Sequence, residues 1–402
     1  MRLLFCSPMR ILTRYVLFDL LRVFLLTLTG LTAIIFVVLM GKEAVDKALG
    51  LGPLLRVAPY LLPQAMQFAV PGTMLLATTS VYGRMASYNE FVAVKSLGIS
   101  PMVLVWPTLV VAALMSFVGV VLNDIAVSWG RLGTARVALE CIEEIAYRQL
   151  EMRHSFNMGK YNITVRDVEG RRLIWPMLII QSSGGGRATT VSADEAELRL
   201  LLDENKLLVR FRNAEAELKN INATVPEEFE YPVPLDELSG ASAKNRSPSN
   251  YALHEIRGAV AEQEELVAKI DQSLTAQAAF GLLTGDFDSL SQPAWQPHEQ
   301  LRQTAQFRLH RLHTEPWRRW ANGFSCLCFV IVGVPVAVWM RFSEFIASFF
   351  ICFLPILVVY YPLLAVSVDQ AKDGALPPQS VWLGNFLLAL AGIWLLRRVN
   401  RY

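Results

Sequence analysis

The amino-acid sequence predicts a helical membrane protein in which six transmembrane helices, arranged as three and three, flank an antiparallel β domain of jelly-roll-like type. Two observations predict this class. Only 18% of the 402 residues are charged and the mean hydropathy is +0.37, whereas soluble proteins carry roughly a quarter charged residues. The charge is also unevenly distributed: 27 of the 35 acidic residues lie between Arg131 and Trp320, so a polar middle separates two apolar ends.

The apolar ends divide into six stretches, each close to the roughly 20 residues that a helix needs to cross a bilayer. They are Tyr15–Met40, Ala58–Tyr82, Pro101–Leu122, Ala321–Met340, Phe345–Val366 and Val381–Leu396. Asp19 and Arg22 lie near the start of the first stretch, where long side chains can reach the interface. Pro63 and Pro71 interrupt the second, which a membrane helix tolerates when its neighbours cover the freed carbonyl groups.

The distribution of lysine and arginine in the short flanks predicts the orientation, because cytoplasmic flanks carry the excess of these residues. One set of flanks holds Arg2, Arg10, Arg14, Arg84, Lys95, Arg341, Arg397, Arg398 and Arg401. The opposite flanks mix Lys42, Lys47 and Arg56 with acidic residues. We therefore expect both termini in the cytoplasm and residues from about 125 to 316 on the exported side.

The first part of the polar middle predicts β structure. A helix over Arg131–Arg148 is expected to lead out of the third span, and apolar residues then alternate with polar ones from about 153 to 235. The clearest hairpin pairs Glu197–Leu202 with Lys206–Arg212. Its inward faces would hold Leu198, Leu200 and Leu202 on one strand and Leu207, Val209 and Phe211 on the other. Short strands without interspersed helices favour a pair of packed sheets.

The second part of the polar middle, Tyr251–His313, has a helical pattern that is broken by a loop at residues 285–293. These observations predict four regions. Residues 1–130 hold three spans and a cytoplasmic helix at about 84–97, residues 131–240 form the β domain, residues 241–316 form a helical extension without an assigned role, and residues 317–402 hold three more spans.

The sequence predicts neither an enzyme nor a bound metal or cofactor. It lacks the glycine-rich phosphate loop, the paired-histidine zinc motif and the nucleophile-elbow motif of a serine hydrolase. His310 and His313 stand among arginines, and Cys326 and Cys328 have the wrong spacing for zinc. Cys141 is the only cysteine in the exported part, so no disulfide can form within it. The net charge of +2 gives no indication of binding to nucleic acid.

Several motifs together resemble a known family. The segment Tyr82–Pro101, with Gly83-Arg84, Glu90 and Gly98 in register, resembles the cytoplasmic segment of the LptF/LptG (YjgP/YjgQ) permeases, the membrane subunits of the lipopolysaccharide-export ABC transporter. Three further stretches agree in order and spacing: Thr190–Leu198, Glu315–Trp317 with Gly333–Val338, and Leu376–Asn385 continuing to Arg398. The resemblance covers residues 10–238 and 315–402, whereas the stretch 251–310 is longer than the family leads us to expect.

The resemblance implies a non-enzymatic transport subunit in the bacterial inner membrane. Two such subunits, homologous or identical, would face each other around a lipid-binding cavity. A separate cytoplasmic ATPase dimer (LptB-like) would drive export, and a periplasmic bridge protein (LptC-like) would receive lipopolysaccharide or a related glycolipid. The motifs do not distinguish an F-like from a G-like subunit. Two other classes stay open: a membrane-anchored interaction or sensor protein, and a secondary transporter, which would need buried charge near mid-membrane.

Three sets of candidate residues follow from the resemblance. Arg84, Glu90, Phe91 and Val94 are expected to couple the ATPase to the membrane helices, although an exposed acid such as Glu90 can also be a merely solvated side chain. Lys42 and Lys47 are candidates for the lipid phosphates, with interfacial snorkelling as the alternative. Acyl chains are expected to contact Leu198, Leu200 and Leu202 if the β domain is an open groove, but not if it is a closed sandwich.

Overall fold

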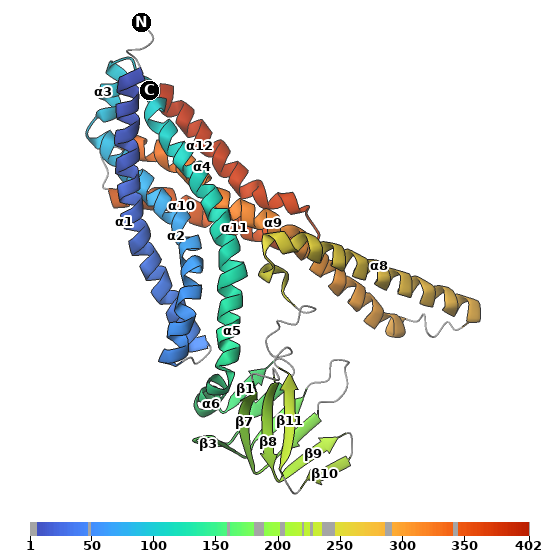
Figure 1. Ribbon diagram of the computed structural model, residues 1–402. Helices are drawn as coiled ribbons and strands as arrows, with labels where there is room; N and C mark the ends of the chain where they lie inside the picture. Colours follow the sequence, from blue (N-terminus) through green and yellow to red (C-terminus); the bar gives the residue numbers. More distant parts are fainter. Residues whose placement is uncertain are drawn as a thin grey trace. The chain divides into compact units, whose positions relative to one another are not determined.

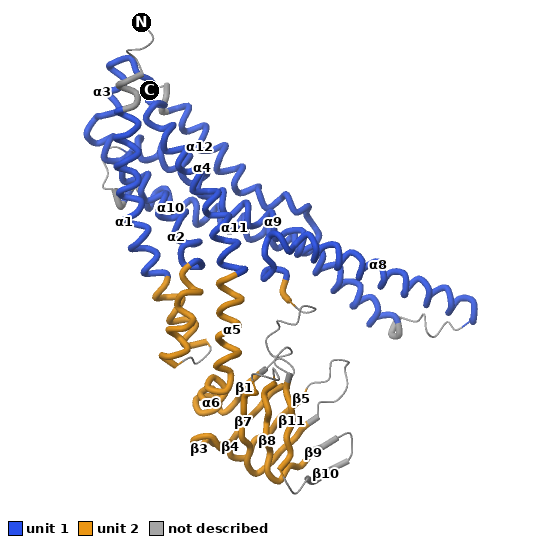
Figure 2. The backbone as a smooth tube through the Cα atoms, viewed as in Figure 1, with its two compact units in different colours: residues 1–35, 63–128, 248–402 blue, residues 36–62, 129–247 orange. Residues whose placement is uncertain are grey.

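The computed structural model divides into two compact units (Figure 2). It describes residues 6–46, 50–158, 161–180, 189–201, 206–218, 221–225, 228–234, 246–285, 292–340 and 345–401. Unit 1 comprises Met1–Ile35, Pro63–Ser128 and Pro248–Tyr402, and unit 2 comprises Phe36–Leu62 and Trp129–Ser247. Helices α1 (Cys6–Asp46) and α2 (Leu51–Ser87) each contribute to both units.

The secondary structure of unit 1 is helical and includes no strand among its described residues (Figure 1). Besides α1 and α2 it contains α3 (Glu90–Ser96), α4 (Met102–Ile125), the 3₁₀ turn η2 (Pro248–Asn250), α8 (Leu253–Thr284), α9 (Gln292–Trp339), α10 (Phe345–Pro355), the π-helical turn η4 (Ile356–Tyr360), α11 (Tyr361–Lys372), the 3₁₀ turn η5 (Pro378–Trp382) and α12 (Leu383–Arg401). A second π-helical turn, η1 (Ala126–Arg131), continues α4 toward unit 2.

Among the described residues, five helical segments are long and apolar enough to cross a membrane: Ile11–Asp46, Met102–Glu140, Trp295–Trp339, Phe349–Lys372 and Pro378–Arg398. The predicted second span lies within α2, which is a continuous helix of 37 residues but contains Gln64 and Gln67 as well as threonines. Membrane helices are therefore a feature of this fold, while the predicted number of six spans stays a prediction.

The threonines of α2 are accommodated inside the helix bundle. Thr73, Thr78 and Thr79 are buried, and each hydroxyl donates a hydrogen bond of 2.9 Å to the carbonyl four residues earlier. Because the backbone of the same helix satisfies these hydroxyls, α2 can bury them without a partner from another helix.

The helical extension and the fourth predicted span form a single helix. The sequence predicts a boundary near residue 316, but α9 runs without interruption for 48 residues from Gln292, with Pro316 inside it. At 1.5 Å per residue this helix is roughly 72 Å long, more than twice the thickness of a hydrocarbon core. Its first part pairs antiparallel with α8, where Gln263 donates to the carbonyl of Ala305 at 3.0 Å (Figure 1). The predicted helical pattern of 251–313 is thus confirmed.

Unit 2 contains two antiparallel sheets, as the alternation predicts. Their strand orders are β1-β2-β5-β6-β9-β10 and β11-β8-β7-β4-β3. The strands are β1 (Ser155–Met158), β2 (Tyr161–Thr164), β3 (Asp167–Glu169), β4 (Arg172–Ile174), β5 (Met177–Ile180), β6 (Thr189–Ser192), β7 (Glu195–Leu201), β8 (Lys206–Arg212), β9 (Ala214–Leu218), β10 (Ile221–Val225) and β11 (Phe229–Pro234). The predicted hairpin is β7–β8, in which Leu198 pairs with Val209 and Leu200 with Leu207.

Two short helices precede the sheets, at the place where the sequence predicts one helix over 131–148. They are α5 (Leu132–Glu140) and α6 (Ile142–Arg153), separated at Cys141. Helix α6 is fixed to β7 by Tyr147, whose hydroxyl accepts a hydrogen bond from the Leu198 amide at 2.9 Å and donates to the Arg171 carbonyl at 2.8 Å. Burial raises the pKa of this tyrosine, so the hydroxyl stays protonated and available as a donor at neutral pH.

A close contact between two helices of unit 1 depends on two glycines. Helices α4 and α9 meet at Gly119 and Gly323, where small residues let the two backbones approach. A β-carbon at Gly323 would clash with a methyl carbon of Val120 and would lie 2.9 Å from the Ser116 carbonyl oxygen. Since a backbone atom cannot be displaced cheaply, this position requires glycine.

Replacing Gly323 with alanine should therefore lower the melting temperature of the purified chain, because α4 and α9 must separate to accept the methyl group. Gly258 on α8 is the matched control, because a β-carbon there meets nothing within 4 Å. Gly258→Ala should keep or raise the melting temperature, since alanine is favoured in a helix by about 1 kcal/mol. Equal melting temperatures for the two variants would contradict the close α4–α9 contact.

Candidate functional site

The predicted coupling segment consists of two helices and a sharp turn. The sequence predicts one helix over 84–97, and this is wrong: α2 ends at Ser87, and α3 begins at Glu90 after Asn89 in the left-handed conformation (φ 57°). Asparagine tolerates this conformation better than most residues, so it can reverse the chain here. Gly98, at φ 73°, ends the segment in the same way.

Two polar contacts within unit 1 connect the coupling segment to α1. Arg84 donates to the carboxylate of Asp19, and this hydrogen bond raises the pKa of the Arg84 guanidinium. The hydroxyl of Tyr15 donates to the Glu90 carboxylate at 3.4 Å. Arg84 and Glu90 therefore both contact α1, at Asp19 and Tyr15, which lie about one turn apart on that helix. Asp19, which the sequence places near the start of the first span, has a partner on α2 that the sequence did not predict.

The apolar candidates on this segment divide by their burial. Phe91 and Val94 are both 8% exposed and belong to a core cluster formed by α1, α2, α4 and α9. Tyr88, Val92 and Leu97 are exposed instead. Phe91 and Val94 therefore attach α3 to the neighbouring helices of unit 1, and Tyr88, Val92 and Leu97 form the exposed surface of the segment.

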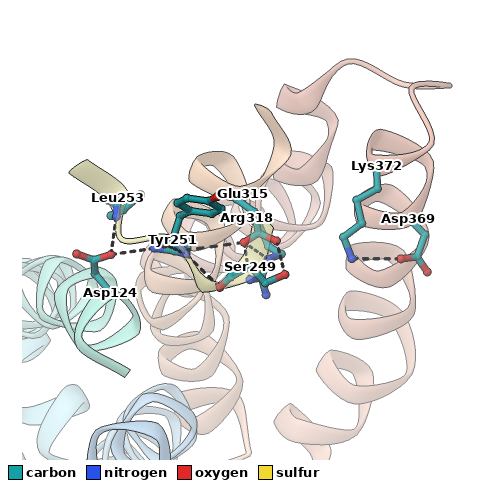
Figure 3. Close-up of polar contacts among 9 residues, drawn as sticks. Asp124, Ser249, Tyr251, Leu253, Glu315, Arg318, Asp369 and Lys372 are labelled. Atoms are coloured by element: carbon teal, nitrogen blue, oxygen red, sulfur yellow. Dashed lines mark hydrogen bonds and ion pairs between the residues drawn. The ribbon is translucent and has the colours of Figure 1, made fainter. Parts of the chain in front are cut away.

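A buried ionic cluster lies where α4, η2 and α9 meet in unit 1 (Figure 3). Arg319 is completely buried, and it donates to the Asp124 carboxylate at 2.8 Å and to the Tyr251 carbonyl at 2.6 Å. The Leu253 amide donates to the same Asp124 oxygen, also at 2.8 Å. The carboxylate of Glu315 accepts a hydrogen bond of 2.6 Å from Arg318, and the Glu315 side chain is only 2% exposed.

Sequence reasoning missed this ionic cluster, although one signal was present. Glu315 and Arg319 are four residues apart and directly precede an apolar span, a spacing at which oppositely charged side chains meet on one face of a helix. Two acids, Asp124 and Glu315, and two arginines, 318 and 319, make the cluster neutral overall. It holds the segment that follows the β domain against α4 and α9, all within unit 1.

The candidate substrate residues of the β domain form part of its core. Leu198 is 1% exposed, and Leu200 is partly buried and packs against the same cluster, which draws residues from both sheets. Leu202 lies outside the described residues. In this structure the inward face of β7 is filled by protein side chains, so acyl chains could contact it only after the sheets separate. The groove therefore stays a prediction.

The basic candidates lie in unit 2. Lys42 is exposed near the end of α1, and Lys47 lies outside the described residues. A cavity of about 490 Å³ near the start of α2 is lined by Arg56, Cys141, Glu144 and Arg148, with Glu144 and Arg148 3.4 Å apart. Two arginines against one glutamate leave this cavity positive. Among the residues that the structure describes, no group of three or more His, Cys, Asp or Glu could hold a metal ion.

Comparison with known proteins identifies the family. The family model described as "Lipopolysaccharide export system permease LptF/LptG" matches residues 14–398, nearly the whole chain. No curated protein gives a significant match. The chain therefore belongs to the LptF/LptG permease family, as the resemblance of its motifs predicts, and the match includes the helical stretch 251–310.

The buried charge of Arg319 leads to a stability prediction. Arg319→Met should lower the free energy of unfolding by about 1.5–3 kcal/mol, because it removes the charged hydrogen bonds from this buried guanidinium to the Asp124 carboxylate and the Tyr251 carbonyl. The matched control is Lys269→Met, which removes an exposed ion pair with Glu265 (2.7 Å) and should change the free energy of unfolding little, because exposed ion pairs contribute little to stability. Thermal or denaturant unfolding of the purified chain compares the two variants. A loss for Arg319→Met as small as that of the control would show that the ionic cluster is not structural.

Proposed function

We propose that this chain is a transmembrane subunit of an ABC exporter that takes lipopolysaccharide, or a related glycolipid, from the bacterial inner membrane. The observation that supports this most strongly is the family match over residues 14–398. Helices able to cross a membrane and a β domain of two antiparallel sheets fit such a role. The family is a transport component, so ATP hydrolysis would belong to a separate subunit.

The proposed assembly contains a second permease subunit, homologous or identical, a cytoplasmic ATPase dimer of the LptB type and a periplasmic bridge of the LptC type. We place both termini in the cytoplasm and residues from about 125 to 316 in the periplasm. The excess of arginine and lysine in one set of flanks supports this orientation.

The ATPase would contact α3 and the turn before it. Exposed Tyr88, Val92 and Leu97 offer apolar contacts, and Glu90 offers a charge beside them. Phe91 and Val94, which face inward, would transmit the motion of α3 to α1, α2, α4 and α9 by direct packing. Because interiors are close-packed, a displacement of α3 cannot be absorbed locally.

The lipid phosphates would bind basic side chains of unit 2. Lys42 and Lys47 are candidates from the sequence, and the cavity lined by Arg56 and Arg148 adds a concave positive surface. Arginine is suited to phosphate because its planar guanidinium can form two parallel hydrogen bonds. Leu198, Leu200 and Leu202 would contact acyl chains only in an opened form of the β domain.

Glu90→Lys should impair binding of the ATPase or abolish transport while the chain still inserts into the membrane. The matched control is Tyr15→Phe, which removes the hydroxyl that donates to Glu90 but keeps the carboxylate. If Glu90 acts on the ATPase, Tyr15→Phe should retain ATPase binding and ATP-dependent lipid release from proteoliposomes. If Glu90 only holds α3 against α1, both variants should fail alike, and the coupling role would be lost.

The substrate role of the β domain can be tested by photo-crosslinking. A photoreactive residue at Leu200 should capture glycolipid only when ATP is present, because the sheets must first separate, with each buried CH₂ then contributing about 0.8 kcal/mol. The neighbouring position Arg199 is the control, since it lies on the exposed face of β7. Equal capture at both positions, or none at either while transport continues, would make this domain a docking scaffold.

The orientation makes a labelling prediction. A cysteine at Glu169, exposed in β3, should react with a membrane-impermeant maleimide in spheroplasts, whereas one at Ser96, exposed in α3, should react only after permeabilisation. Background labelling is expected to be low once Cys6 is replaced by serine, because Cys141, Cys326, Cys328 and Cys352 are buried. The reverse pattern would invert the proposed topology.

A further inference from the structure

A second feature of α3 lies on the flank opposite Glu90. Helix α3, Pro101, the C-terminal end of α9 and the C-terminal part of α12 enclose a cavity of about 670 Å³ within unit 1. Figure 1 shows α3 and the C-terminus at the same end of that unit. The volume lies inside the range of about 300–1,000 Å³ that is usual for sites that hold small ligands.

The walls of this cavity are apolar and aromatic. Phe91, Pro335, Val338 and Leu395 contribute apolar surface, and Trp339 and Trp394 line the cavity while staying 76% and 61% exposed. Tryptophan side chains gather at the boundary between the hydrocarbon and water, where one part of the ring is in lipid and the other is wet. These two tryptophans lie at the ends of two helices that are apolar enough to cross a membrane.

The charges that line the cavity have one sign. Lys95 on α3 and Arg398 on α12 are its two charged lining residues, and neither forms an ion pair with any residue that the structure describes. Arg398 instead lies over the Trp394 ring, 5.7 Å from its centre. Two positive charges from different helices, uncompensated and beside apolar walls, are complementary to an anion that carries hydrocarbon.

We propose that this cavity binds a membrane lipid with a phosphate-bearing, anionic headgroup. Lys95 and Arg398 would hold the phosphate, Arg398 being positioned for it by Trp394, and the apolar walls would hold the first part of the acyl chains. Basic pockets between helices are the usual binding sites for such headgroups. The lipid would act as a structural ligand that joins α3 to the ends of α9 and α12.

This lipid site shares Val92 with the proposed contact with the ATPase, but its charged residue on α3 is Lys95 and not Glu90. With 3.6 residues per turn, Glu90 and Lys95 project from α3 roughly 140° apart. Glu90 faces Tyr15 of α1, whereas Lys95 faces the cavity beside α9 and α12. Binding of a lipid in this cavity does not require the transport function, so it can be measured without an ATPase or lipopolysaccharide.

The test uses the full-length chain purified in detergent, with bound lipid measured by native mass spectrometry. Phosphatidylglycerol should bind in preference to phosphatidylcholine, which has no net charge. Lys95→Ala or Arg398→Ala should weaken the binding of phosphatidylglycerol about tenfold, since hydrogen bonds to charged groups are of that strength. Lys95→Glu should abolish the preference. Lys95 and Arg398 are exposed, so these variants should fold, which their melting temperatures in the absence of lipid check.

Arg397→Ala is the matched control, because Arg397 is an exposed neighbour of Arg398 that does not line the cavity. It should retain the wild-type preference for phosphatidylglycerol. Inorganic phosphate in excess should compete weakly, because it lacks the acyl chains; complete displacement by phosphate would show a site for free phosphate and overturn the proposal. Equal binding of the two lipids, or the same loss in Arg397→Ala as in Arg398→Ala, would also overturn it.

Discussion

Arg319 has no surface exposed to solvent, and a full charge cannot stay buried unless hydrogen bonds and an opposite charge replace its water. Asp124 supplies the charge, and the Tyr251 carbonyl supplies a further acceptor. These groups belong to α4 and to the segment that returns to unit 1 after the β domain. The ionic cluster thus determines which helices can be neighbours: α9 must lie against α4, and the start of α8 must lie against both.

The close contact of α4 with α9 extends this constraint along both helices. Gly119 and Gly323 let the two backbones approach about one turn away from the ionic cluster. In an apolar environment, packing of this kind replaces the hydrophobic effect as the source of helix association, so shape and buried polar contacts have to specify the arrangement. The charged cluster fixes the partner helices, and the glycines fix how close they come.

Much of the fold could be predicted from hydropathy and periodicity, because both report which faces of a segment avoid water. The hairpin β7–β8 has the predicted partners, and the helical pattern of 251–313 is present. The single helix α9 could not be predicted, since the polar stretch before residue 316 and the apolar stretch from Ala321 were assigned to separate regions, although one helix holds both and accommodates Pro316. The break at Tyr88–Asn89 was missed for a related reason: Asn89 adopts a left-handed conformation that hydropathy does not report.

Interactions between distant residues were the hardest to predict. Asp19 and Arg84 are 65 residues apart and Tyr15 and Glu90 are 75 apart, so no local pattern connects them. The structure nevertheless explains why a helix of only seven residues can hold its place. Isolated helices of this length are unstable in water, so the stability of α3 has to come from its contacts. Packing of Phe91 and Val94 holds the inner face, Tyr15 adds one exposed hydrogen bond of 3.4 Å, and the proposed lipid between Lys95 and Arg398 would hold the other flank. A helix held in this way moves only together with the helices on which it packs, as the proposed coupling role requires.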